Sequence, residues 1–157
     1  MSFSIRKMTV ADIPAVVALD QISFTLPWPE RSFRFEVTDN PASRCWVAEI
    51  DGQIVGMIVA WLFVDEVHIA TLATNPDFRR QGIAQKLLTH TLRYTYDEGA
   101  VSSFLEVRES NLAAQEMYRK FGYENTGRRK RYYKDNDEDA ILMTLSPLNV
   151  ESLTSDV

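Results

Sequence analysis

The sequence predicts a mixed α/β (α+β) domain built on a mostly antiparallel sheet of about six to seven strands. We expect a central parallel pair and about four helices on both faces of the sheet. Short apolar runs separated by turn residues follow one another between 45 and 74, as in hairpin-connected strands. Between 66 and 108, two strand-like segments flank one clear helical pattern, which predicts two parallel strands joined by a right-handed crossover.

The beginning of the chain predicts one strand and two helices. The expected elements are a strand over 3–7, a helix from Thr9 to about Ile22, and a helix over 30–38. Thr9 is followed three residues later by Asp12, which is the pattern of a capping box at a helix start. The segment Leu26-Pro27-Trp28-Pro29 interrupts the chain between the two helices.

Three strands are expected next, over 45–50, 54–61 and 66–74. Asp51-Gly52 is a strong hairpin-turn signal between the first two. The segment 54–61 is almost continuously apolar, which indicates that both of its faces are covered.

The second half of the chain alternates helices and strands. Gly82 should open a helix that ends near Gly99, and 103–108 should form a strand. Ser110 or Asn111 can cap the next helix, whose C-terminal exit fits Gly122. Two closing strands are expected over 123–134 and 140–145, with a turn over 135–137.

Bulk properties bound the class of protein. A length of 157 residues suits one domain, expected over 1–148, followed by a polar tail over 149–157 that should fray. The net charge of -5 argues against direct nucleic-acid binding, because phosphate contacts need many cations. A single cysteine, Cys45, excludes a disulfide framework and suggests a reducing, cytoplasmic setting. The apolar stretch 54–64 is too short to cross a bilayer, so no membrane partner is expected.

The most informative stretch is Arg79-Arg80-Gln81-Gly82-Ile83-Ala84, which lies between a strand and a helix. The first turn of a helix offers free backbone N–H groups and partial positive charge, and Gly82 leaves room for an anion. Two arginines at the mouth complete a seat for a pyrophosphate. The alternative is that Gly82 only eases the turn and that the arginines are solvated. The patterns of triphosphate and dinucleotide loops do not occur in the chain.

The stretch Arg79-x-x-Gly82-x-Ala84 resembles the pyrophosphate loop of the GNAT superfamily of N-acetyltransferases. More narrowly, nearly the whole chain is similar to RimI-type ribosomal-protein N-terminal alanine acetyltransferases. The matching stretches are Pro27-Trp28, 72–82, 105–111, 117–123, and Tyr132-Tyr133 followed by 138–143. The resemblance implies a GNAT fold and acetyl-CoA as co-substrate, with no metal.

The resemblance also implies roles for two residues. Glu106 would be the general base, and Tyr118 the general acid that protonates the departing thiolate. Strand alternation places Glu106 and Arg108 on one face, so an ion pair between these two is the alternative. For Tyr118 the alternative is core packing, which is compatible with a presented hydroxyl.

The cofactor residues implied are the backbone of a strand edge and of the loop, with Asn111 and, as a weaker candidate, Arg79 contributing side chains. They are Leu72, Ala73, Thr74, Arg79, Arg80, Gln81, Gly82, Ile83, Ala84, Gln85 and Asn111. Asn111 can equally serve only as a helix cap. Trp28, Tyr132 and Tyr133 are candidate walls of the acceptor site, with ordinary packing as the alternative.

The expected function is acetyl transfer from acetyl-CoA to an amine, most simply the N-terminal α-amine of a peptide or protein. A small amine or a lysine side chain is the nearest alternative acceptor, and a non-catalytic CoA-binding module is an alternative of another class. The basic run 128–131 either neutralises CoA or an acidic peptide, or is a solvated strand edge. His68 and His90 are expected to be ordinary sheet and helix residues, without metal-ligand spacing.

Overall fold

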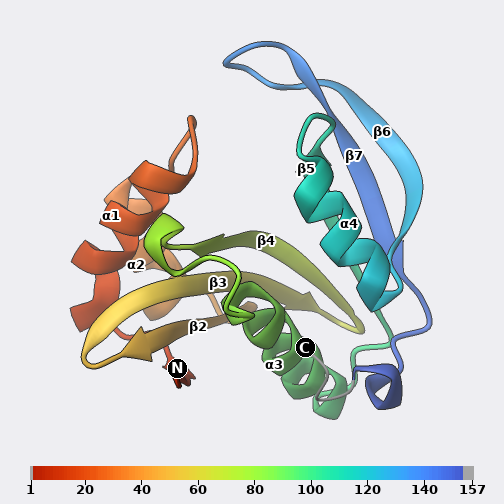
Figure 1. The fold of residues 1–157 in the computed structure, drawn as a ribbon. Coiled ribbons are helices and arrows are strands. Elements are labelled where there is room, and N and C mark those ends of the chain that lie inside the picture. The colour runs from red at the N-terminus through yellow and green to blue at the C-terminus, as the bar shows by residue number, and fades with distance from the viewer. Residues whose placement is uncertain (1, 154–157) are drawn as a thin grey trace.

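The computed structural model describes residues 2–153 and confirms the predicted fold class (Figure 1). Its strands are β1 (Ser4–Lys7), β2 (Ser43–Ile50), β3 (Gln53–Phe63), β4 (Glu66–Thr74), β5 (Ser102–Arg108), β6 (Glu124–Tyr133) and β7 (Glu138–Leu145). Its helices are α1 (Ile13–Ser23), α2 (Glu30–Thr38), α3 (Ile83–Asp97) and α4 (Leu112–Phe121). Short 3-10 helices cover Val10–Asp12, Pro76–Phe78 and Val150–Ser152.

The strands form one sheet in the order β1-β2-β3-β4-β5-β7-β6, and every adjacent pair except β4 and β5 is antiparallel. The predicted hairpin between β2 and β3 turns at Asp51 and Gly52, both with positive φ (49° and 81°). This left-handed pair matches the right-handed twist of the flanking strands. No helix within residues 2–153 has the length and apolar character needed to span a membrane.

Side chains alternate between two cores on opposite faces of the sheet. Val47 and Met57 face α1 and α2, whereas Trp46 and Ile58 face α3. Because β3 carries apolar residues on both faces, it is covered on both sides, as its sequence predicted. Tyr118 brings α4 into the core on the α3 side.

The parallel strands β4 and β5 pair along only part of their length and then diverge like a fork. The gap between them, here called the opening, positions the site. Paired residues run from Glu66–Ser102 to Ile69–Leu105, and both strands continue beyond that point. Figure 1 shows β4 and the β5–β7–β6 part of the sheet diverging there, with α4 next to the opening. The end of β4 remains paired with β3 on its other edge, so its fork-side backbone edge faces the opening.

The end of the described chain is packed, in contrast to the expected fraying. Leu148 and Leu153 are both buried, and the backbone N–H of Leu148 donates to the Val101 oxygen at 2.7 Å. Burial of these leucines holds residues 149–153 against the domain. The rest of the expected tail, 154–157, lies outside the described residues.

Candidate active site

The N-terminus of α3 is an open anion seat. Arg80 and Gly82 both have left-handed backbone conformations (φ 66° and 77°), and among residues 2–153 no side chain caps the helix. The first bond of the α3 ladder runs from the Lys86 N–H to the Gly82 oxygen at 2.9 Å. The N–H groups of the preceding helical residues are therefore left for another acceptor, and the helix dipole favours an anion there.

A cavity of about 730 Å³ runs from this helix end along β4 to α4. All the residues expected to bind the cofactor line it except Gln81, whose side chain is exposed. The Thr74 hydroxyl oxygen, in the wall of this cavity, is buried and has no hydrogen-bond partner within residues 2–153. Asn111 does cap α4, because its Oδ1 accepts from the Ala114 N–H at 3.1 Å, and it also lines the cavity.

A second cavity of about 220 Å³ lies across the opening, between β4, β5 and α1. The residues shared by both cavities are Phe24, Leu72, Asn111, Ala114 and Tyr118. Of the candidate acceptor walls, Trp28 and Tyr133 line the second cavity. Tyr132 does not line this cavity; it is 46% exposed and packs edge-on against Tyr133, and its pKa is raised by partial burial and then by the charge of the nearby Glu106 carboxylate.

Glu106 points into the second cavity and is held by two basic residues. Its side chain is 10% exposed, Oε1 lies 2.8 Å from His68 Nε2, and Oε2 lies 3.4 Å from Arg129 Nε. The hydrogen bond with His68 is the largest cause that lowers the pKa of Glu106. Partial burial opposes this effect, and the charge of Arg129 adds to it. Glu106 is therefore a carboxylate at neutral pH.

The alternative ion pair between Glu106 and Arg108 is not formed. Arg108 instead contacts Asp135 at 2.9 Å and Glu138 at 3.2 Å, and its guanidinium carbon lies 4.0 Å from the Tyr133 ring centroid. Burial is the main cause that raises the pKa of Tyr133 to about 12. Arg108 thus fixes the turn between β6 and β7 and the tyrosine that lines the cavity.

His68 and Arg129 are the contacts of Glu106 that sequence reasoning missed. His68 lies opposite Phe104 in the parallel register, and the two rings stack with centroids 4.5 Å apart. Phe104 lies two residues before Glu106 and on the same face of β5. Trp61 packs edge-on against His68 at 5.2 Å. Only the register of β4 against β5 brings this imidazole to Glu106, and no local motif encodes that register.

Tyr118 lies where the two cavities meet. It is 8% exposed and its ring packs edge-on against Tyr123, with centroids 5.6 Å apart. Desolvation raises the pKa of Tyr118, so the phenol keeps its proton throughout the neutral range. Its hydroxyl has no hydrogen-bond partner within residues 2–153, so packing leaves this donor free for a ligand.

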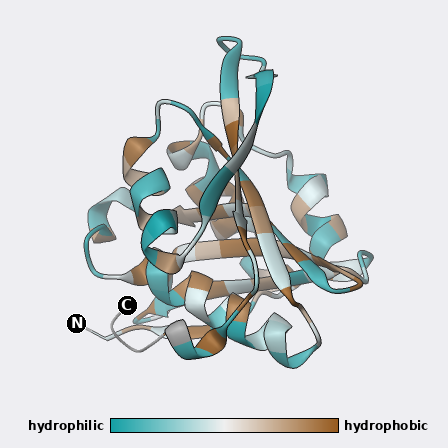
Figure 2. Cartoon of the chain, turned by 90° about the vertical axis from the view of Figure 1, so that its right-hand side faces the viewer, coloured by the Kyte–Doolittle hydropathy of each residue, from teal (hydrophilic) through white to brown (hydrophobic). Residues whose placement is uncertain are grey.

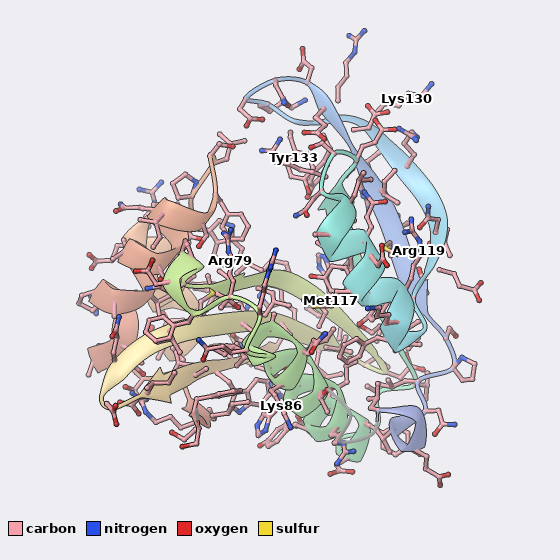
Figure 3. The ribbon with its side chains drawn as sticks, in the orientation of Figure 1. Arg79, Lys86, Met117, Arg119, Lys130 and Tyr133 are labelled. Carbon is pink, nitrogen blue, oxygen red and sulfur yellow. The ribbon has the colours of Figure 1, made fainter. Side chains whose placement is uncertain are left out.

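The hairpin of β6 and β7 forms the outer wall of the opening. In Figure 3, Tyr133 and Met117 lie on the side that faces the opening, whereas Lys130 lies on the outer side. Figure 2 shows that the outer end of the hairpin is hydrophilic. Within the basic run, Arg128 is bound by Glu109 (2.7 Å) and Asp139 (2.8 Å).

Cys45 and His90 line neither of the two cavities. Cys45 is buried, and desolvation raises the pKa of its thiol. His90 packs against Trp46, with ring centroids 4.9 Å apart. Within the described part of the chain, no three His, Cys, Asp or Glu side chains are grouped to hold a metal ion.

Comparison with known proteins agrees with this geometry. The model of the acetyltransferase (GNAT) family matches residues 13–123. A Bacillus subtilis protein, named as a candidate [ribosomal protein bS18]-alanine N-acetyltransferase, is 37% identical over 140 residues, which cover 89% of this chain and 93% of that protein. The [ribosomal protein bS18]-alanine N-acetyltransferase of Escherichia coli K12 is 30% identical over 146 residues, covering 90% of this chain and 96% of the relative.

Solved structures show the same similarity. The crystal structure of the ribosomal-protein-S18-alanine N-acetyltransferase from Escherichia coli superposes with a TM-score of 0.86 at 29% identity, covering 94% of this chain and 95% of that one. Ard1 from Thermoplasma volcanium has the same TM-score at 27% identity, covering 95% and 100%. The resemblance to RimI-type enzymes found in the sequence is confirmed. The chain belongs to the acetyltransferase (GNAT) family and is an acyl-CoA-dependent N-acetyltransferase.

Proposed function

We propose that this chain acetylates the N-terminal α-amine of a protein, such as ribosomal protein bS18, with acetyl-CoA as the donor. The observation that carries the proposal is the meeting of two cavities at Tyr118. One cavity leads to an open helix N-terminus with two arginines, and the other contains the carboxylate of Glu106. The bS18-alanine acetyltransferases named above support this choice of acceptor.

The first cavity fits acetyl-CoA in charge and in hydrogen-bonding groups. The pyrophosphate would bind the backbone N–H groups of residues 80–85, with Arg79 as an additional cation. The pantetheine would run along the fork-side edge of Leu72–Thr74, in the manner of an added strand. The unpartnered hydroxyl of Thr74 offers one more polar contact along this path. Acetyl-CoA would supply the activated thioester at the junction with the second cavity.

Glu106 in the second cavity and Tyr118 at the junction can carry out direct transfer. Glu106 accepts a proton from the acceptor nitrogen as that nitrogen bonds to the carbonyl carbon and becomes more acidic. A free α-amine has a pKa of about 7.7–8.0, so a weak base is sufficient. Tyr118, protonated at neutral pH, donates to the sulfur as the carbon–sulfur bond breaks.

A peptide panel tests this function. Acetyl-CoA turnover should be measured with short peptides that differ in their first residue, with an N-terminally blocked copy of each and with small amines. Free peptides beginning with alanine should react at least about 10-fold faster than small amines, because only a peptide can use contacts along the opening. Faster turnover of a small amine would show that the acceptor is a small amine and not a protein N-terminus. Tight CoA binding without any turnover would indicate a non-catalytic module.

His68 should set the acidic limb of the pH profile. His68→Phe keeps the ring stack on Phe104 but removes the hydrogen bond to Glu106, which is the largest cause that lowers the pKa of that carboxyl. The pKa of Glu106 should rise, and the acidic limb of log(kcat/KM) should move to higher pH, because the base must be deprotonated. The control His68→Gln retains a donor and should move the limb less. An unmoved limb in His68→Phe would show that Glu106 does not control it.

A further inference from the structure

Asp20 is a buried carboxylate in the wall of the second cavity. It lies in the last turn of α1 and is 1% exposed. Its Oδ2 accepts one hydrogen bond, from the backbone N–H of Trp28 at 2.7 Å. Within residues 2–153 no lysine, arginine or histidine forms an ion pair with it.

This environment disfavours the charge of Asp20. A carboxylate at the C-terminal end of a helix meets the negative pole of the helix dipole, and burial removes its hydration. Desolvation accordingly raises the pKa of Asp20. The other buried carboxylates are better satisfied, because Asp12 is bound by Arg6 (2.7 Å) and Glu36 accepts from Trp61 (2.7 Å) and Asn40 (3.1 Å).

The other charged groups that line the second cavity already have partners. Glu106 is bound by His68 and Arg129, and Arg108 is bound by Asp135 and Glu138. An acceptor that enters this cavity therefore meets one carboxylate with no balancing cation. An α-amine, with a pKa of about 7.7–8.0, arrives mostly as a cation at neutral pH.

We propose that Asp20 binds the α-ammonium group of the acceptor in the second cavity. The inference rests on the proposed function, in which the acceptor is an α-amine. The unpaired oxygen of Asp20 accepts a hydrogen bond from the ammonium group while Oδ2 keeps its bond to Trp28. Asp20 thus binds the charged form of the amine. One proton leaves to solvent before the nitrogen can attack, and Glu106 takes up the second proton as the nitrogen bonds to the carbonyl carbon.

Calorimetry with two peptides tests this role. One peptide begins with alanine, and its analogue carries a hydroxyl in place of the α-amine. Both are titrated at about pH 6.5 into the CoA-bound protein, so that no transfer occurs and the amine is charged. Wild type should bind the amine peptide about 10- to 100-fold more tightly, as expected for a charge-assisted hydrogen bond. Asp20→Asn, which keeps an oxygen for the Trp28 N–H, should bind the two peptides within about 3-fold.

The matched control is Asp39→Asn, an exposed aspartate at the end of α2, which should behave as wild type. Unchanged CoA affinity in Asp20→Asn shows that the variant is folded, and retained discrimination in that variant would overturn the inference. If the variant does not fold, the wild-type comparison decides, because equal binding of the two peptides excludes an ammonium site. If the wild-type protein acetylates peptides but binds the amine peptide no more tightly than its hydroxyl analogue, only the role of Asp20 is refuted. If the wild-type protein binds neither peptide, the proposed function is refuted as well.

Discussion

Glu106→Gln should lower kcat for peptide acetylation by about 100- to 10,000-fold, the range for loss of a general base. The amide can still accept a hydrogen bond from His68 but cannot take up a proton. The Kd for acetyl-CoA should change by less than about 2-fold, because Glu106 does not line the first cavity. Pre-steady-state kinetics of acetyl transfer and calorimetry of CoA binding measure the two effects separately.

The control for this prediction is Glu109→Gln. Glu109 lies three residues further along the chain, is exposed and contacts Arg128 on the surface. Because surface ion pairs contribute little, this variant should retain wild-type kcat within about 2-fold. A kcat loss below about 10-fold in Glu106→Gln would contradict the assignment of the base.

Tyr118→Phe should lower kcat by at least about 100-fold without loss of stability. The ring keeps its packing against Tyr123, and the missing hydroxyl has no partner within residues 2–153 whose bond would be lost. Removing a hydroxyl that faces the cavities and bonds no protein group leaves no other buried polar group unpaired, so the free energy of unfolding should not fall. The midpoint of thermal unfolding should therefore stay the same or rise while turnover falls.

The kinetic signature separates an acid from a packing residue. If Tyr118 protonates the thiolate, an acyl donor with a more acidic thiol leaving group should recover part of the lost rate in Tyr118→Phe. The matched variant Tyr123→Phe removes a hydroxyl that bonds Ser103 at 2.7 Å, so it should reduce stability and leave transfer intact. Wild-type kcat in Tyr118→Phe would contradict the acid role.

Local signals were sufficient to predict the fold and the anion seat. The bounds of α2 and β4 match those read from periodicity and from flanking prolines and turn residues. The loop before α3 is contiguous in sequence, so Gly82 and its neighbours identify it without knowledge of the tertiary structure.

The acceptor side depends on register, which the sequence does not encode locally. Glu106, His68 and Arg129 come from three strands, and the pairing of β6 with β7 shifts between Arg129 and Tyr133, next to the left-handed Arg131. Successive side chains of a strand point to opposite faces. A one-residue shift therefore decides which of Tyr132 and Tyr133 lines the cavity. Asp20 was missed because nothing in its local sequence indicates that it is buried without a cation.

The most direct test of the central claim is to locate the acetyl group on a peptide that offers both kinds of amine. The peptide begins with alanine and contains one internal lysine, and the product is sequenced by tandem mass spectrometry after reaction with acetyl-CoA. We predict acetylation at the α-amine alone. Acetylation of the lysine, or no acetylation by protein that binds acetyl-CoA, would contradict the account.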